Sequence, residues 1–272
     1  VMIVKFYFWT MFKKEFFYLF KIQYLGFRYH GWQKQPDLLT VERMMQRTLK
    51  YVLGRNNFKF IAAGRTDAKV SVNATYVELI LQEEPLAVND FFKVFNDNLP
   101  QDIRLLEVIE KSKQTNIIQA PKLKEYIYLF SFGEKNHPFC APYMVNVKGA
   151  LDIALMQRGA SLMQGTHDYR NYAYKATAET QTLMTIESSV IEENTLYTAS
   201  FFPKHSYVFK VVGAGFKRHQ VRLMMGALFD LGSGILSWEA FEQSLDGTIP
   251  YKLTHIAQAS GLILQEINLE EH

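Results

Sequence analysis

Apolar and polar positions along the first half of the chain follow two periods, which predict strands and helices. Four apolar runs have the length and the aromatic or β-branched content typical of strands: residues 16–26, 58–64, 73–82 and 103–110. After the first run, the hydroxyl of Thr40 precedes apolar residues that recur at helical spacing and stop near Gly54. This pattern predicts a capped helix over 41–53.

A second helix is predicted between the third and fourth apolar runs. Asn89 opens it, three phenylalanines follow on one side of it, and it ends before Pro100. The predicted order of elements is therefore β-α-β-β-α-β. This is the order of a ferredoxin-like unit, which fills residues 16 to about 110.

The second half repeats this design less regularly. In the run 125–132 the aromatic residues alternate, so that Tyr126 and Tyr128 lie on the same face of a predicted strand. Further apolar patterns predict more strands and helices. The strands cover 182–191, 196–202, 207–213 and 261–267, and the helices run from about 148 to 163, through Val221, Met224, Met225 and Leu228, and from Trp238.

Together the patterns predict an α+β protein of two ferredoxin-like (RRM-like) halves. Their strands join edge to edge into one mixed or antiparallel sheet, with the helices on one face and a basic cleft between the halves. The expected divisions are an N-terminal extension at 1–15, a first half at 16–120 and a second half at 121–272. The aromatic start lacks the basic region and cleavage site of a signal peptide, and Met11 is a natural alternative beginning.

The amino-acid composition argues against a membrane protein and a disulfide-bonded protein. Apolar residues make up 48% of the chain, and no apolar stretch reaches the ~18 residues of a membrane span. The single cysteine precludes an internal disulfide, so a globular cytoplasmic protein is expected. The net charge is only +3. Basic residues nevertheless gather beside the polar loops, which suits an anionic partner and equally a solvated surface.

One polar stretch, AAGRTDAKVS at 62–71, interrupts two predicted strands and holds the strongest candidate for chemistry. Asp67 follows Gly64 and Arg65 there. A guanidinium this near favours the ionised carboxylate, which suits a nucleophile better than a general acid. An Arg and an Asp that pair only to hold a turn would have the same spacing, so the pattern alone leaves both interpretations open.

This stretch resembles the GRTDxGVxA motif of the TruA family of tRNA pseudouridine synthases, and further resemblances follow in the family's order. The segments that carry them are YLGFRYHGWQKQPDLLTVERMMQRTL, NDNLPQDIRLLEV, KEYIYLFSF, HPFCAPYM, GTHDYRNY, VVGAGFKRHQVRLMMGAL and AQASGLILQEI. They extend over roughly residues 18–268, nearly the whole chain. Each motif is short, but their number and shared order make the resemblance specific.

The resemblance implies a reaction and a role in it for four residues. Family members isomerise uridine in tRNA to pseudouridine, breaking the bond from ribose C1′ to N1 and rejoining the base through C5, without a metal or organic cofactor. By motif position, Asp67 would be the nucleophile, attacking C1′ or C6 or acting first as a base, with Arg65 as its ion-pair neighbour. Tyr126 would stack on the target base. Arg222 would pair with the aspartate or fill the place of the flipped base.

The residue patterns alone give these positions ordinary alternatives. Tyr126 would also fit a core aromatic residue, and Tyr128 would fit its role. Arg222 lies at the edge of an apolar helical stripe and would fit a solvated face. Weaker candidates are basic residues that neighbour the motifs and would neutralise RNA phosphates. They are Lys69, Lys122, Lys124, Lys217 and Arg218.

Other polar residues are assigned no chemistry. His30 and Trp32 are expected to be structural. His167 and Asp168 have no third ligand at metal spacing, so no metal site is predicted. Cys140 lies in a predicted loop and is given no role.

The chain departs from the family pattern at several positions. Lys69 stands where the family usually has glycine, and Ser71 stands where bacterial members often have histidine. If that glycine has a positive φ, a lysine is strained there. The segment TNIIQAPKL lacks the FxAR pattern, and Met184 replaces an arginine. These changes bear on the tRNA positions and the rate more than on the reaction.

The expected function is therefore pseudouridine synthesis in the anticodon stem-loop of tRNA, at positions thirty-eight to forty, by a homodimer whose subunits both touch each tRNA. Two alternatives stay open. One is a tRNA-binding chaperone that lost catalysis through Lys69 and Ser71. The other is an enzyme that acts with Asp67 and Arg65 on a small nucleotide or phosphorylated substrate, against which the lack of a glycine-rich phosphate loop counts.

Overall fold

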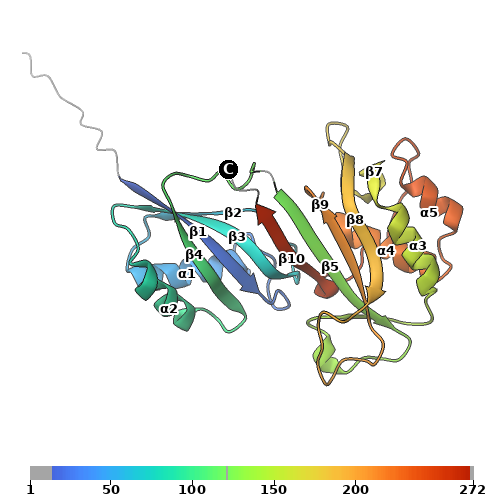
Figure 1. The fold of residues 1–272 in the computed structure, drawn as a ribbon, viewed down its shortest axis with the longest axis horizontal. Helices are drawn as coiled ribbons and strands as arrows, with labels where there is room; N and C mark the ends of the chain where they lie inside the picture. Colours follow the sequence, from blue (N-terminus) through green and yellow to red (C-terminus); the bar gives the residue numbers. More distant parts are fainter. Residues whose placement is uncertain (1–13, 121, 270–272) are drawn as a thin grey trace, which may run out of the picture.

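The computed structural model describes residues 14–120 and 122–269, and most of the predicted N-terminal extension, with Met11, lies outside this range. Within these residues, ten strands form one mixed sheet and five α-helices pack on it (Figure 1). The predicted α+β class is confirmed. None of the helices in the described ranges is long and apolar enough to cross a membrane.

The first half follows the predicted order of elements. They are β1 (Glu15–Tyr24), α1 (Val41–Leu53), β2 (Phe58–Ala62), β3 (Ser71–Gln82), α2 (Val88–Asn98) and β4 (Ile103–Lys111). β1 pairs antiparallel with β3 and β4, and β2 pairs antiparallel with β3. As predicted, the Thr40 hydroxyl caps α1 by accepting from the Arg43 amide, and Gly54 ends the helix with a φ of 67°.

The second half contains more elements than the apolar pattern predicts. They are β5 (Lys122–Phe132), the 3-10 helix η1 (Pro138–Cys140), β6 (Val145–Val147), α3 (Ile153–Leu162), β7 (Gly165–Asp168), the 3-10 helix η2 (Tyr169–Tyr172), β8 (Leu183–Glu193), β9 (Tyr207–Gly213), α4 (Gln220–Gly232), α5 (Trp238–Ser244), the 3-10 helix η3 (Ala259–Gly261) and β10 (Leu262–Leu269). The short strands β6 and β7 are not predicted. The helix expected from about 148 begins at Ile153, because Asp152 caps it by accepting from the Leu155 amide.

The strand predicted at 196–202 is wrong. This segment forms turns, and its aromatic residues pack with η1 against one face of β5, beside Ile127 and Leu129. The opposite face of β5 carries Tyr128 and Phe130, which belong to the core under α3 and α4. The apolar residues of 196–202 therefore cover a sheet instead of extending it.

β10 joins the two halves into one sheet. It runs parallel to β3, where Leu264 pairs with Val72, and antiparallel to β5, where Leu264 pairs with Tyr126. The strand order is β4-β1-β3-β10-β5-β9-β8-β7, and Figure 1 shows β10 in the middle of the molecule. Leu264 belongs to the core of the first half and Leu262 to that of the second, and Tyr126 packs against both. The last described strand is therefore shared by both cores.

Candidate active site

The loop that carries Asp67 runs from the end of β2 to the start of β3. The segment between β1 and α1, residues 25–40, holds it from one side. The Trp32 amide donates to the carbonyl of Thr66 at 3.2 Å, and the Lys69 amide donates to the carbonyl of Tyr29 at 3.0 Å. Backbone hydrogen bonds across the two segments thus fix the loop on both sides of Asp67.

Two glycines let residues 25–40 approach the loop closely. A Cβ on Gly26 would lie 1.9 Å from the carbonyl oxygen of Val70. A Cβ on Gly31, whose φ is 86°, would lie 2.6 Å from the carbonyl oxygen of Thr66. Both distances are below any real carbon–oxygen contact, so the packing that positions Asp67 requires glycine at both places.

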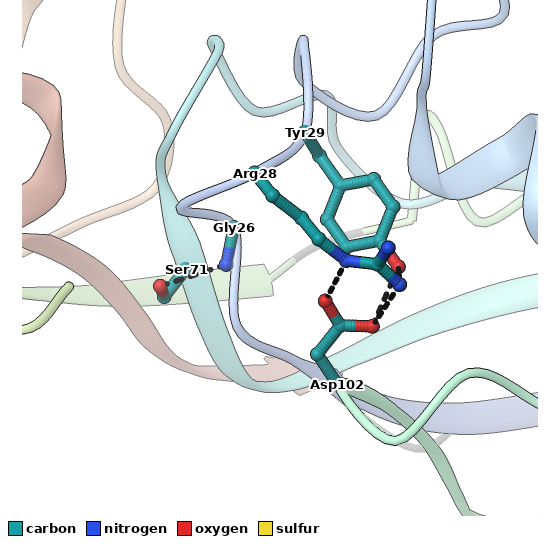
Figure 2. Close-up of polar contacts among 5 residues, drawn as sticks. All are labelled: Gly26, Arg28, Tyr29, Ser71 and Asp102. Carbon is teal, nitrogen blue, oxygen red and sulfur yellow. Dashed lines mark hydrogen bonds and ion pairs between the residues drawn. The ribbon is translucent and has the colours of Figure 1, made fainter.

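Polar side chains complete this support (Figure 2). The Ser71 hydroxyl accepts a 2.9 Å hydrogen bond from the Gly26 amide, so Ser71 has a structural role in this loop. Arg28 forms a two-pronged ion pair with Asp102, which precedes β4, and the Tyr29 hydroxyl donates to the same carboxylate at 2.6 Å. Burial opposes ionisation of Asp102, but the bonds from Arg28 and Tyr29 outweigh it and hold its pKa below the usual range.

Lys69 has the backbone conformation that glycine would favour. Its φ is 67°, in the left-handed region. The strain expected at this departure from the family pattern is therefore present. The Lys69 ammonium lies 5.9 Å from the ring centre of Phe27, and both residues line the cleft described below.

Arg222 of α4 and His219, the residue just before α4, meet the Asp67 carboxylate. Nη1 of Arg222 and Nε2 of His219 each lie 3.3 Å from Oδ2 of Asp67. Nε of Arg222 also donates to the carbonyl of Ala257 at 2.8 Å, so the guanidinium is fixed between the carboxylate and the segment before β10. The Arg222 side chain is 16% exposed. The structure thus brings together Asp67 and Arg222, which lie 155 positions apart in the sequence.

Arg65 is placed differently from the expected ion-pair neighbour of Asp67. Within residues 14–120 and 122–269, the ion pairs of Asp67 are those to Arg222 and His219. Arg65 lines the same small cavity as the carboxylate but forms no ion pair or hydrogen bond with it. Arg65 has no ion-pair partner among the described residues, so its guanidinium is available to an anionic ligand.

A cavity of about 460 Å³ lies beside Asp67. Tyr126 lines it, with the ring of Phe216 edge-on at 5.2 Å between centroids. Burial and the charge of Asp67 raise the pKa of Tyr126, so its hydroxyl stays neutral at physiological pH. Tyr128 is fully buried, and its hydroxyl donates to the carbonyl of Gln258 at 2.7 Å. The structure thus distinguishes the two tyrosines: only Tyr126 reaches the cavity.

A larger cleft of about 1330 Å³ opens on the other side of Asp67. It exceeds the roughly 300–1,000 Å³ typical of small-molecule pockets. Segments from both halves line it, including 27–38 and 133–148, and its basic lining residues are Lys69, Lys135, Lys148, Arg218 and Arg222. Lys217 lines the smaller cavity. Three of the five candidate RNA-binding residues, Lys69, Lys217 and Arg218, therefore border the site.

The other two candidates, Lys122 and Lys124, lie on β5. The Lys122 ammonium donates to the carbonyls of Ile117 and Ile118, and burial lowers its pKa. Burial, together with the nearby charge of Lys122, lowers the pKa of Lys124 to about 8. The Lys124 ammonium lies against Gly64, since a Cβ there would be 2.9 Å from Nζ. Lys124 therefore contacts the start of the Asp67 loop without lining the cleft or the smaller cavity.

The remaining candidates have the following places. Trp32 is buried in the first-half core, whereas His30 is exposed and lines the large cleft, which sequence reasoning did not foresee. His167 and Asp168 lie on β7, and no group of three His, Cys, Asp or Glu side chains within the described ranges is placed to hold a metal ion. Cys140 is buried and also borders the cleft.

His219 is the residue that sequence reasoning missed. It precedes α4 with a φ of 59°, and its Nδ1 is buried without a hydrogen-bond partner in the described part of the chain. Burial lowers its pKa, the charge of Asp67 partly offsets this, and Arg222 and Arg218 lower it further. Its place three residues before Arg222 was visible in the sequence, but nothing there indicated that both side chains meet one carboxylate.

Comparison with known proteins gives one consistent result. A family model described as tRNA pseudouridine synthase matches residues 160–268. The tRNA pseudouridine synthase A of Pelobacter propionicus is 30% identical over 248 residues, which cover 91% of this chain and 97% of the relative. The tRNA pseudouridine synthase A 2 of Bacillus thuringiensis is 27% identical over 252 residues, which cover 92% of this chain and 98% of the relative.

Proposed function

Because the chain belongs to the TruA family of tRNA pseudouridine synthases, we propose that it isomerises uridine to pseudouridine in tRNA, with Asp67 as the catalytic aspartate. The observation that carries this proposal is the convergence of Asp67, Arg222 and Tyr126 on one cavity at the edge of a large basic cleft. Family membership supports the reaction, and the geometry supports the residues.

The proposed reaction balances without an external reagent. The bond from ribose C1′ to N1 breaks, a bond from C1′ to C5 forms, the proton on C5 leaves, and N1 gains a proton. A nucleophile or base beside the ribose and a surface that retains the detached uracil are sufficient for these steps.

The residues around the smaller cavity fit these needs. Nη1 of Arg222 lies 3.3 Å from Oδ2 of Asp67 and holds the carboxylate beside the cavity. The neutral Tyr126 ring supplies a face on which a uracil taken out of its helix can stack. Arg65, which lines the same cavity, is a candidate for the phosphate or ribose of the target nucleotide.

The RNA-binding part of the proposal rests on the large cleft. Its basic lining and its size suit a folded RNA that is recognised through backbone and shape. We propose Lys69 and Arg218 in this cleft, Lys217 in the smaller cavity, and Lys122 and Lys124 on β5 as contacts for RNA phosphates. The proposed target is the anticodon stem-loop, positions thirty-eight to forty. We also propose a homodimer in the cytoplasm, in which both subunits touch each tRNA.

We extend the proposal to the fold. The first half, residues 16–120, would be a ferredoxin-like unit, since β4, β1, β3 and β2 are neighbours in that order. The second half, residues 121–272, would be a related unit whose last strand, β10, inserts between β3 and β5. The cleft would then be the space where the two units meet over the sheet.

Carbodiimide mapping of pseudouridine in unmodified tRNA transcripts tests this function. Wild-type protein is expected to create new stops in the anticodon stem-loop. The variants Asp67→Ala and Asp67→Asn are expected to lose at least about a thousandfold in turnover while tRNA still binds. Asp97→Asn is a matched control, because Asp97 is exposed on α2 and its ion-pair partner among the described residues is Lys93. Near-normal turnover by Asp67→Asn would refute the assignment of the aspartate.

One observation favours a second candidate function, a tRNA-binding relative without catalysis. Lys69 holds a strained conformation two residues after Asp67. In the same experiment, tRNA binding without any stops from wild-type protein would favour this candidate. Failure to bind any tRNA at low salt would instead favour an enzyme acting on a small nucleotide.

A further inference from the structure

His219 presents its imidazole to the same carboxylate oxygen as Arg222. Nε2 of His219 lies 3.3 Å from Oδ2 of Asp67, whereas Oδ1 has no hydrogen-bond partner in residues 14–120 and 122–269. The side chain is 16% exposed. Two nitrogens, one from α4 and one from the residue just before it, therefore approach one oxygen of the carboxylate and leave the other oxygen open to the cavities.

The surroundings of the ring fix its plane. Tyr174 lies with its ring centre 4.7 Å from that of the imidazole, and the Arg218 guanidinium lies 5.3 Å from the centre of the Tyr174 ring. The Tyr174 amide also donates to the carbonyl of Arg218 at 3.1 Å. A left-handed residue kept in a packed position of this kind is typical of functional sites.

The protonation state of the ring follows from its neighbours. The charged groups that face it are Asp67 from the β2–β3 loop and Arg218 and Arg222 from the α4 segment, and Tyr174 faces it without charge. Burial and the two arginines disfavour the imidazolium. A neutral ring this near a carboxylate is stable with its proton on Nε2, because a lone pair there would face negative charge. Nδ1 is then an acceptor, and its lack of a partner leaves no N–H unpaired.

We propose that His219 is a positioning residue, which donates from Nε2 to Oδ2 of Asp67 and leaves Oδ1 as the atom that meets the substrate. This inference rests on the proposed function. In this structure the 3.3 Å contact is an ion-pair distance without the alignment of a hydrogen bond. Catalytic hydrogen bonds in free enzymes are often poorly aligned and tighten when the substrate binds. Arg222 contributes charge at this oxygen, and the Tyr174 ring, whose centre is 4.7 Å from that of the imidazole, limits the orientations from which His219 can donate.

The tautomer of His219 can be measured without turnover. In protein labelled with ¹⁵N in histidine, the signals of His219 are assigned by their loss in His219→Gln. The expected result near neutral pH is a neutral ring protonated at Nε2, whose signal shifts in Asp67→Asn. A ring protonated at Nδ1, or one insensitive to Asp67→Asn, would overturn the proposal. If wild-type protein made no pseudouridine, the proposed function would fail and this measurement would still decide the contact.

Rate measurements on two variants of His219 can distinguish a role in positioning Asp67 from a role in packing. His219→Gln and His219→Leu carry the same backbone strain and nearly the same volume, but only glutamine keeps a nitrogen donor. We expect His219→Leu to lower the single-turnover rate constant for pseudouridine formation about ten- to a hundredfold, with the Kd for tRNA unchanged. We expect His219→Gln to retain most of the wild-type rate. Equal thermal unfolding of the two variants shows that both fold alike. A wild-type rate constant in His219→Leu would overturn the proposal.

Discussion

Lys69 has a side chain that does not suit its backbone. The left-handed conformation costs an L-residue about 1–2 kcal/mol, and glycine avoids this cost but adds about 0.4–1 kcal/mol of entropy to the unfolded chain. We therefore expect Lys69→Gly to raise the free energy of unfolding by roughly 0.5–1 kcal/mol, measured by urea denaturation. Lys69→Ala is the control, since it removes the ammonium and keeps the strain. Equal stability of the glycine and alanine variants would contradict this explanation.

The lowered pKa of Lys124 predicts that RNA binding depends on pH. Burial lowers its pKa to about 8, and a phosphate beside it would raise that pKa, so affinity is greatest below about pH 8 and falls as the pH rises above it. The Kd of wild-type protein for tRNA should increase severalfold between about pH 7 and about pH 9. Lys124→Arg should remove this increase, because arginine stays charged.

The exposed Lys113 supplies the control for this measurement. Lys113→Arg should leave the pH dependence of wild-type protein intact, because Lys113 lines neither the cleft nor the smaller cavity. If Lys124→Arg and wild-type protein weakened in parallel from about pH 7 to about pH 9, Lys124 would not be a phosphate contact.

At the scale of elements, the segment between β1 and α1 determines where Asp67 lies. In Gly31→Ala the new Cβ would push on the carbonyl of Thr66, and a shift of about 1 Å at a catalytic group costs about a hundredfold in rate. We expect that loss in kcat for pseudouridine formation. Gly54→Ala is the control: Gly54 has a φ of 67° with nothing within 4 Å of the new Cβ, so stability should fall by about 1 kcal/mol without loss of kcat. A similar loss of kcat in both variants would contradict the clash.

The ion pair in Figure 2 ties this segment to β4, and its contribution depends on pH. The pKa of Asp102 is lowered in the folded state, so its stabilisation is full above the usual pKa of an unfolded aspartate and is lost as the pH falls through the lower, folded value. We expect Asp102→Asn to lower the free energy of unfolding by about 1.5–3 kcal/mol near neutral pH. The difference from wild-type protein should shrink below about pH 4. A constant difference would mean that packing, not charge, is responsible.

Helices and strands could be predicted from the sequence where nearby residues mark their ends or their period. The helix α1 is an example, because Thr40 and Gly54 mark both of its ends by their own chemistry. The segment 196–202 is the opposite case. Its aromatic residues look like those of a strand, but they pack onto the face of β5, and periodicity cannot tell a strand from a segment that covers one. β6 and β7 have three and four residues, too few for a pattern to be seen.

At the scale of the whole molecule, the candidate site depends on contacts between distant segments. The family resemblance pointed to Asp67, Tyr126 and Arg222, and the structure places them together. The alternation of the strand could not separate Tyr126 from Tyr128, because it places both on the same face. The two differ in the fold: the Tyr128 hydroxyl donates to the carbonyl of Gln258, just before η3, whereas Tyr126 lines the cavity. The resemblance missed His219, because only the folded chain brings α4 against the loop.

The pairing of β10 with strands of both halves predicts that the two halves unfold together. Leu264 is 1% exposed on this shared strand, so Leu264→Ala should cost about 2–5 kcal/mol. Hydrogen exchange should then increase in β1 of the first half and in α4 of the second half alike. Leu123→Ala on β5 is the control, since Leu123 is 38% exposed and should cost less than about 1 kcal/mol. Faster exchange in one half only would show that the halves are independent.

The position of β10 also bears on how the protein is made. β10 follows all the other described strands along the chain, so it leaves the ribosome after them. Until then, the stretch of β3 next to the Asp67 loop has an unpaired edge, and such edges recruit strands from other chains. The nascent first half is therefore the form most prone to aggregate. The Asp67 loop gains its final support only when translation delivers the strand that closes this edge.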